Sequence, residues 1–288
     1  MDHHGAIVVG LGQTKEGRRE LDWAAREARL RDRPLHVLRA YHLSEAAVPW
    51  ETPDDRSMNA ELRAASQDRL RAAAAYLADA SPDIVVKTLA VDGRPASVLC
   101  DASAAAELTV VGSRQLGALG STVIGSVGNA VAAAASGPVV VVRGVAEDQP
   151  GTSRVVVGID GSDVTGDVLD FAFEYASQHG CELLVVYCWP LELYHERAWA
   201  GPPAKPESAD RWLAEAVAGR SADYPEIDVQ RLAVRDHAID RLVSESHSQQ
   251  LLVVGVHAKH PRIATLLGSV TQGVLHHATC PVAVVHHI

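Results

Sequence analysis

A glycine-punctuated stretch that occurs twice holds the residues of this sequence best suited to bind an anion. It runs from Gly112 to Ser126 in the first half and from Gly255 to Ser269 in the second. Each copy follows a short apolar run and reaches a Gly-Ser pair at which an alanine- and valine-rich segment begins, which indicates a strand, a loop and a helix in that order. The first N–H groups of a helix are unpaired and its dipole is positive at that end. The pattern therefore predicts two phosphate-binding loops for a nucleotide.

The segments that must position these loops are themselves repeated. Gly10 matches Gly158 at an offset of 148 residues, and the offset becomes 143 between Gly112 and Gly255. A helical stripe of apolar residues recurs at the first offset, as Leu21, Ala24, Ala25 and Ala28 and then as Leu169, Ala172, Phe173 and Ala176. Self-similarity of this kind indicates one duplicated unit.

Short apolar runs alternate with amphipathic stretches in both halves. We expect strands at 6–11, 35–41, 84–91, 108–112 and 139–142, and at 154–159, 182–187, 227–234, 251–255 and 282–285. Helices are expected at 16–31, 59–80, 95–105 and 126–135, and at 164–179, 207–222, 239–246 and 269–278. Strands that are apolar at nearly every position and are joined by helices favour parallel sheets covered on both faces. The sequence therefore predicts an α/β protein with two tandem, doubly wound, Rossmann-like sheets of five parallel strands each.

The connecting segments suggest where the two domains divide and how they associate. A linker is expected at 146–153, between domains at 1–146 and 153–288. The long segments 44–55 and 191–206 follow the second strands, and we expect either lids over the ligand edge of each sheet or plain surface loops. The run Val139–Val142 would be an adhesive edge if left open. We therefore expect the last strands of the two halves to pair with pseudo-two-fold symmetry, within one chain or in a homodimer.

Composition limits the classes of partner. The formal charge of −10 argues against a general nucleic-acid binder. No apolar run is long enough to span a membrane, and the first residues lack the features of a secretion signal. The four cysteines form no Cys-x-x-Cys pair, so we expect a cytoplasmic protein with reduced, buried thiols. The fourteen histidines show no ligand spacing with carboxylates, and no metal site is expected.

The motifs, taken in order, resemble the tandem universal stress proteins, and the resemblance covers nearly the whole of both halves. The run Val157-Gly158-Ile159-Asp160-Gly161-Ser162 matches the family's run after the first strand, and the spacing of its Gly-x2-Gly-x9-Gly-[Ser/Thr] loop is kept twice. The resemblance implies a fold like that of the adenine nucleotide alpha hydrolases and a loop that wraps the phosphates of ATP, with Mg²⁺ as a companion of the nucleotide. It also implies a role in stress response or growth regulation through a protein partner that the sequence does not identify.

The resemblance also implies the binding residues. In the second half they are Gly158, Asp160, Cys188, Val254, Gly255, His257, Ala258, Gly268, Ser269 and Val270. In the first half they are Gly10, Ala40, Gly112, Arg114, Gln115, Gly125 and Ser126.

Three departures from the family pattern predict an asymmetric protein. The middle glycine of the loop is Gln115 in the first half and Ala258 in the second, and Gly12 stands where the second half has Asp160. A side chain at the middle position costs about 1–2 kcal/mol if a positive φ is needed there, or blocks the phosphate if close approach is needed. We expect the second half to be the better nucleotide site.

Each candidate also has a purely structural interpretation. Asp160 could close the turn into the next helix through an Asx-type bond, and Ser126 and Ser269 could be plain N-caps. Arg114 and His257 could be solvated loop residues, and Ala40 and Cys188 could be ordinary packing at the ends of strands. A structural role and a binding role are compatible at the same residue.

Catalysis has little support in the sequence, which has neither a nucleophile elbow nor a Walker lysine. We therefore expect a binding protein, with slow ATP hydrolysis as the most that it achieves. Two other hypotheses stay open: a scaffold that has lost nucleotide binding, and a binder of another adenine ligand such as a cyclic nucleotide.

Overall fold

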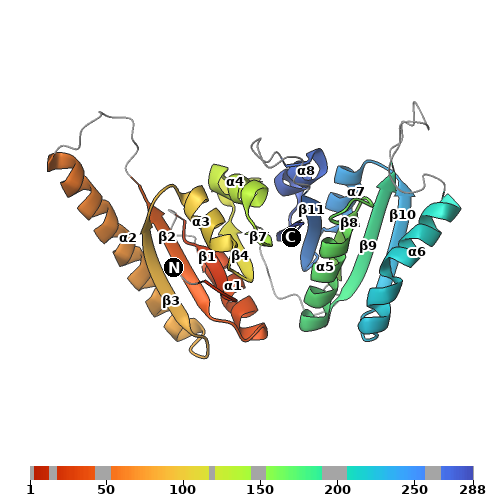
Figure 1. Ribbon diagram of the computed structural model, residues 1–288, viewed down its shortest axis with the longest axis horizontal. Coiled ribbons are helices and arrows are strands. Elements are labelled where there is room, and N and C mark those ends of the chain that lie inside the picture. Colours follow the sequence, from red (N-terminus) through yellow and green to blue (C-terminus); the bar gives the residue numbers. More distant parts are fainter. Residues whose placement is uncertain are drawn as a thin grey trace. The chain divides into compact units, whose positions relative to one another are not determined.

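The structure is a computed structural model that describes residues 3–12, 18–42, 53–116, 121–143, 154–189, 206–256 and 267–287. It forms two compact α/β units (Figure 1). The first unit contains Met1–Gly112 and Gly125–Val139, and the second contains Ser113–Ile124 and Val140–Ile288. The expected linker and most of the two long segments after the second strands lie outside the described residues, so the domain boundaries at 146 and 153 stay a prediction.

Each half contains the predicted parallel sheet. In the first, the order β4-β1-β2-β3 is formed by β1 (Ile7–Gly10), β2 (Leu35–Tyr41), β3 (Val86–Asp92) and β4 (Leu108–Gly112), and β7 (Val139–Val142) follows in the chain. In the second, the order β10-β9-β8-β11-β12 is formed by β8 (Arg154–Ile159), β9 (Glu182–Trp189), β10 (Val229–Arg235), β11 (Leu251–Val256) and β12 (Val282–His286). The first strand of each half lies inside its sheet, which is the doubly wound arrangement.

The strand registers confirm the duplication. Ile7 lies opposite Leu35 in the first half, and Val155 lies opposite Leu183 in the second. Both residues of the second pair are displaced by the same 148 positions that relate Gly10 to Gly158. The change of offset falls between the second and third strands, where α2 (Pro53–Ala80) has 28 residues and its counterpart α6 (Pro206–Asp223) has 18.

Helices cover both faces of each sheet. The remaining helices are α1 (Arg18–Leu30), α3 (Pro95–Ser103), α4 (Ser126–Ala134), α5 (Thr165–His179), α7 (Ala238–Glu245) and α8 (Ser269–His277). In each half the first helix contacts the second and the third contacts the fourth, so two pairs of helices enclose the strands. Every residue of the two predicted stripes is buried, with at most 3% of its surface exposed.

Three details differ from the expectations. The second helix begins at Pro53, not near residue 59, and its counterpart also begins at a proline, which is favoured at the first helical position. A short antiparallel hairpin of β5 (Arg114–Leu116) and β6 (Ser121–Val123) was not predicted. All four cysteines are free, but Cys100 and Cys188 are only partly buried, not buried as expected.

The described residues show neither a membrane-spanning helix nor a metal cluster. No helix in these ranges is long and apolar enough to cross a bilayer. Within the same ranges, no group of three His, Cys, Asp or Glu side chains lies close enough together to hold a metal ion.

Candidate functional site

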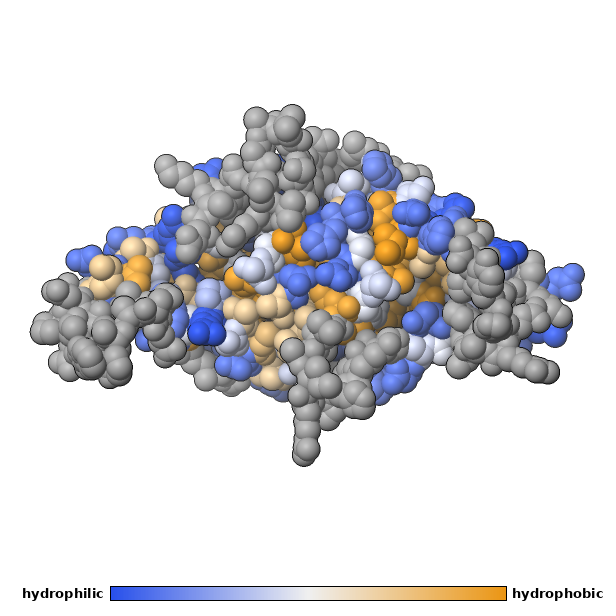
Figure 2. Space-filling view, turned by 90° about the horizontal axis from the view of Figure 1, so that it is seen from above, coloured by the Kyte–Doolittle hydropathy of each residue, from blue (hydrophilic) through white to orange (hydrophobic). Residues whose placement is uncertain are grey.

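A cavity of about 680 Å³ opens in the second half where the strands end. Its walls come from the ends of β8, β9 and β11, from the first turns of α5 and α7, and from the start of α8. Its volume lies within the range of about 300–1,000 Å³ that is usual for small-molecule sites. Seen from the side on which the strands end, the surface shows apolar residues between hydrophilic ones (Figure 2). This is the edge at which open α/β sheets bind ligands.

The predicted residues of the second half converge on this cavity. It is lined by Gly158, Asp160, Cys188, Val254, Gly255, Gly268, Ser269 and Val270. The other two, His257 and Ala258, lie outside the described residues.

One wall of the cavity is the N-terminus of α8. Gly268 is its N-cap, with φ −58° and ψ 153°, and among the described residues no side chain caps the helix. Ser269 is the first helical residue and is exposed. Of the two interpretations of Ser126 and Ser269, that of plain N-caps is wrong, because a glycine takes that position in both halves. Because the N-cap is a glycine and has no side chain to cover the first N–H groups, this helix end can receive an anion.

The glycines of the cavity have different physical roles. A Cβ on Gly158 would lie 2.8 Å from Cδ1 of Leu242, and one on Gly255 would lie 2.7 Å from Cγ1 of Val164. These two glycines let helix side chains approach the strands closely. A Cβ on Gly268 would meet no atom within 4 Å, and its φ suits any residue. Packing of the described residues therefore gives no reason for a glycine at 268, whereas close approach of a ligand does.

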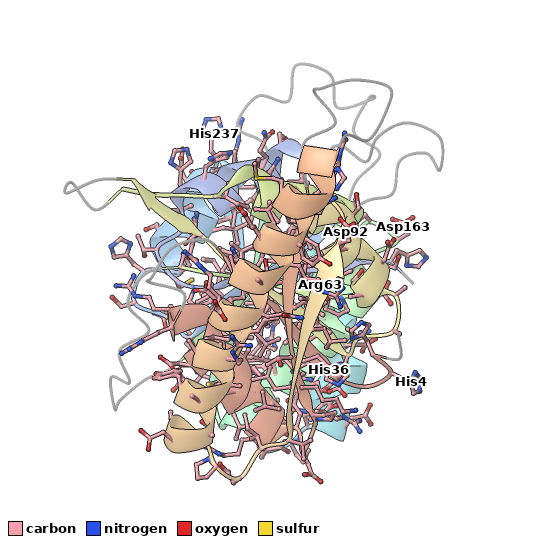
Figure 3. The ribbon with its side chains drawn as sticks, turned by 90° about the vertical axis from the view of Figure 1, so that its left-hand side faces the viewer. His4, His36, Arg63, Asp92, Asp163 and His237 are labelled. Atoms are coloured by element: carbon pink, nitrogen blue, oxygen red, sulfur yellow. The ribbon has the colours of Figure 1, made fainter. Side chains whose placement is uncertain are left out.

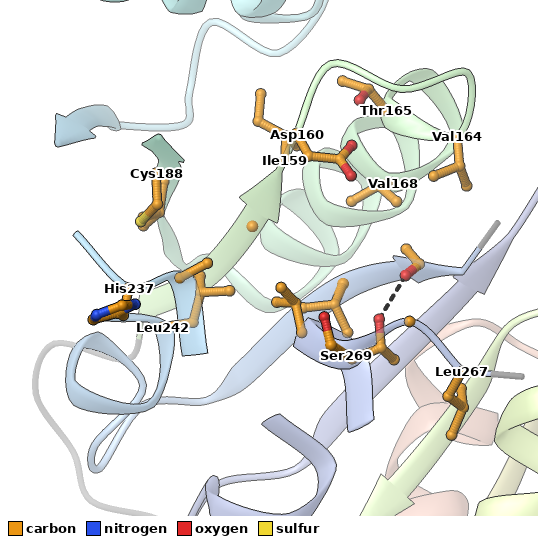
Figure 4. A pocket seen from close by; sticks show the side chains of 18 of the residues that line it. Ile159, Asp160, Val164, Thr165, Val168, Cys188, His237, Leu242, Leu267 and Ser269 are labelled. Carbon is orange, nitrogen blue, oxygen red and sulfur yellow. Dashed lines mark hydrogen bonds between the residues drawn. The ribbon is translucent and has the colours of Figure 1, made fainter. Parts of the chain in front are cut away.

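Asp160 lies across the cavity from Ser269 (Figure 4). Its Oδ1 accepts hydrogen bonds from the backbone N–H of Ser162 at 3.1 Å and from the Ser162 hydroxyl at 2.5 Å. Gly161 between them has a φ of +78°, which favours glycine. The Asx-type turn is therefore present, and the same exposed carboxylate also faces the cavity.

The wall near β9 and α7 carries little charge. Burial raises the pKa of the Cys188 thiol to about 11, with nearby carboxylates adding to the effect, so the thiol is neutral at physiological pH. Leu242 and Val186 line the same side. At the mouth, a backbone hydrogen bond from His237 and the guanidinium of Arg241 lower the pKa of Asp236 and hold its carboxylate in place.

Several lining residues were missed by the sequence reasoning. They are Ile159, Val164, Thr165, Val168, Val186, Asp236, His237, Ala238, Leu242, Leu267 and Thr271. Most are apolar or small and resemble ordinary core residues in the sequence. Asp236 and His237 could have been predicted from the sequence, because they are polar residues that directly follow the end of a strand, as Asp160 does.

The candidates of the first half occupy matching places in their own sheet. Gly10 is the last residue of β1 and packs against Leu99, as Gly158 packs against Leu242. Ala40 lies in β2 opposite Val91. Gly112 ends β4, while Gly125 and Ser126 begin α4. Arg114 and Gln115 lie in the hairpin, opposite Val123 and Thr122, and are grouped with the second unit.

In the first half, two arginines bond to the backbone of Gly12, which stands where the second half has Asp160. Arg39 donates from Nη1 to the carbonyl oxygen of Gly12 at 2.7 Å, and Arg69 does so at 3.5 Å. Asp92 lies at the carboxyl end of β3 (Figure 3), with its Oδ1 3.5 Å from Nδ1 of His42. The two halves therefore share a backbone fold but carry different charged residues at the ends of their strands.

The sequence model of the universal stress protein family matches residues 4–143 and again residues 151–286. A universal stress protein of Mycolicibacterium smegmatis is 34% identical over 291 residues, which cover 97% of this chain and 96% of that protein. Universal stress protein Rv2005c of Mycobacterium tuberculosis is 32% identical over 293 residues, with 98% and 96% covered. Among solved structures, a universal stress protein from Archaeoglobus fulgidus has a similar fold, with a TM-score of 0.67 at 16% identity and 99% and 98% coverage.

Proposed function

The chain belongs to the universal stress protein family, and from that premise we propose that its second half binds ATP in the cavity between Asp160 and the start of α8. The observation that carries the proposal is that a helix N-terminus with a glycine N-cap and a carboxylate lie on opposite sides of one cavity. Occupancy of this site would change the interaction with a protein partner and so serve a stress response or growth control. The four free thiols support a reducing, cytoplasmic setting.

The phosphate end of the ligand belongs at α8. The N–H groups of the first helical turn point along the helix axis toward the cavity, and the helix dipole adds to their attraction for an anion. Gly268 leaves room for the phosphate oxygens to reach the backbone, because a Cβ added at this residue would have no described atom within 4 Å.

The nucleoside end belongs at β8 and β9. A ribose hydroxyl can donate to the Asp160 carboxylate, since a charged acceptor makes a strong hydrogen bond. The base can lie against Cys188 and Leu242, where a neutral thiol and an aliphatic side chain form an apolar wall. A cavity with a few polar groups in an apolar lining is typical of a site for an aromatic base.

We propose binding without efficient turnover. The described lining of the cavity contains neither lysine nor arginine, the side chains that usually stabilise a phosphoryl group during transfer. Mg²⁺ enters the proposal only as a companion of the triphosphate. The described lining holds two carboxylates: Asp236, which is paired with Arg241, and Asp160, which faces the cavity.

The test is a count of bound nucleotide by native mass spectrometry after purification without added ATP, followed by titration with ATP. We expect one ATP per chain in the natural protein and none in Gly268→Val, because the valine side chain fills the space left for phosphate. Gly219→Val is the matched control, since a Cβ on Gly219 in α6 also meets no atom within 4 Å. Unchanged binding in Gly268→Val would refute the proposed site.

The scaffold hypothesis is the second candidate, and the replacement of the middle loop glycine by Gln115 and Ala258 favours it. It predicts a ligand-free mass that stays unchanged at millimolar ATP. Titration with a cyclic adenine nucleotide in the same experiment tests the third hypothesis, which requires tighter binding of the cyclic ligand than of ATP.

We also propose that the last strands of the two halves pair within one chain. Support comes from Val139–Val142, which are at most 4% exposed, and from the grouping of Val140–Val142 with the second unit. Arg143, 2% exposed, donates from Nη1 to the carbonyl oxygen of Ala278 at 2.8 Å. Light scattering should then give the mass of a single chain, whereas a dimer that persists on dilution would favour pairing between chains.

A further inference from the structure

The two halves differ in charge at one position of their first helices. Glu20 of α1 corresponds to Val168 of α5 at the offset that relates the first strands. A Cβ on Gly112 would lie 2.8 Å from Cδ and 2.9 Å from Oε1 of Glu20. A Cβ on Gly255 would lie 2.9 Å from Cγ2 of Val168, which lines the cavity of the second half. The Glu20 carboxylate therefore takes the place of an apolar wall, against the glycine that ends the fourth strand.

No cation among the described residues pairs with the Glu20 carboxylate. Glu20 is only 9% exposed, and burial raises the pKa of its carboxyl, while its backbone hydrogen bond and Arg19 act in the opposite direction. None of the ion pairs among the described residues includes Glu20. The elements β2 and α2 pack against α1 and carry Arg39 and Arg69. Both arginines donate hydrogen bonds from Nη1 to the carbonyl oxygen of Gly12. Within the described ranges, the Glu20 carboxylate at the strand ends therefore has a backbone hydrogen bond but no ion pair.

We propose that Glu20 keeps phosphate-bearing ligands out of the first half, so that the chain has one nucleotide site and not two. The inference rests on the proposed function of the second half. A phosphate placed beside a carboxylate in a poorly hydrated site meets a repulsion that water does not screen. Gly12 removes an attraction, the hydrogen bond that Asp160 offers in the second half, whereas Glu20 adds a repulsion. The exclusion acts on the charge of a ligand and not on its shape.

The first test asks whether removal of the charge opens the first half. Gly268→Val closes the second site, and Glu20→Gln is added to it because glutamine keeps the size of the side chain. Native mass spectrometry at millimolar ATP should find one ATP per chain in the natural protein, none in Gly268→Val and one in the double variant. A double variant that binds none, beside a natural protein that binds one, would overturn the inference. A natural protein that binds none would instead refute the proposed function.

The second test moves the charge into the second half. Val168→Glu and Val168→Gln add side chains of the same size, so their difference reports charge alone. We expect Val168→Glu to bind ATP at least about tenfold more weakly than Val168→Gln, while the two bind uncharged adenosine within about twofold of each other. Equal losses of ATP affinity in both variants would contradict a charge-based exclusion. Should the buried position not tolerate either residue, the Glu20→Gln comparison still decides the matter.

Discussion

The hydroxyl of Thr271 donates a hydrogen bond to the backbone carbonyl oxygen of Gly255 across 2.8 Å, the bond drawn in Figure 4. The two residues stand at opposite ends of the predicted phosphate loop, Gly255 near the end of β11 and Thr271 in the first turn of α8. Thr271 corresponds to Gly128 of the first half at the offset of 143. Because a glycine has no side chain to make this bond, the repeat provides the tie between strand and helix only in the second half.

Replacement of Thr271 by valine should loosen this tie. Valine keeps the shape of threonine but leaves the Gly255 carbonyl without its donor, which should cost about 1 kcal/mol of unfolding free energy. Affinity for ATP should fall by a few-fold because the loop ends are no longer fixed together. Calorimetric titration and thermal unfolding measure both effects. Thr271→Ser is the control that keeps the hydroxyl, and an equal loss in that variant would show that the methyl group matters instead.

Asp160 should contribute to ATP binding beyond its role in the turn. Asp160→Ala removes both the carboxylate in the cavity and the acceptor for Ser162, whereas Ser162→Ala removes only the 2.5 Å side-chain hydrogen bond. We expect Asp160→Ala to weaken ATP binding about tenfold, equivalent to about 1.4 kcal/mol, and Ser162→Ala to change it little. If Ser162→Ala costs as much affinity as Asp160→Ala, the carboxylate acts through the turn and not through the ligand.

The fold could be predicted because its signals are local and repeated. The stripe of Leu169, Ala172 and Phe173 has helical spacing, and the apolar runs have the length and the continuity of buried parallel strands. Because the chain is duplicated, each helix and strand could be identified from two copies of its pattern. The matching registers of Ile7 with Leu35 and of Val155 with Leu183 agree with the duplication. The hairpin after β4 was missed because its residues lie inside the stretch interpreted as a phosphate loop.

The site could be predicted only at residues whose chemical type itself suggests a binding role. The glycines, Asp160 and the serine of the Gly-Ser pair were predicted in this way, and those of the second half line the cavity. Leu242 and Val164 were not, because an aliphatic residue has the same appearance in a core and in a cavity wall, and only the tertiary packing against Gly158 and Gly255 distinguishes the two. Glu20 was also missed, since a glutamate in an amphipathic helix usually faces solvent.

The buried Glu20 carboxyl should make stability depend on pH. Burial is the main cause that raises its pKa in the folded state above the ordinary value of a glutamate. A raised folded pKa means that the folded state binds the proton more tightly than the unfolded state. The contribution to stability is therefore present below the unfolded pKa and is lost as pH rises through the folded pKa.

Glu20→Gln removes this titration. At pH 8 the variant should be more stable than the natural protein by on the order of 1 kcal/mol, a rise of about 2–4 °C in the midpoint of thermal unfolding. The difference should shrink as the pH falls below the folded pKa. Thermal unfolding across a pH series measures it, with Asp22→Asn on the same helix as the control. A Glu20→Gln variant that is no more stable at pH 8 than at pH 4, each relative to the natural protein, would contradict a buried charge.

Cys188 offers a chemical probe of the proposed site. Its thiol lines the cavity and is partly exposed, and burial is the main reason that its pKa is about 11. The thiolate is the reactive form, so alkylation by iodoacetamide should be slow at neutral pH and should accelerate about tenfold from pH 8 to pH 9. Millimolar ATP should protect Cys188, because a base against the β9 wall blocks the reagent. Cys100, partly exposed on α3 of the first half, is the internal control for peptide mass spectrometry. Protection of Cys100 without protection of Cys188 would place the nucleotide in the first half and reverse the proposed asymmetry.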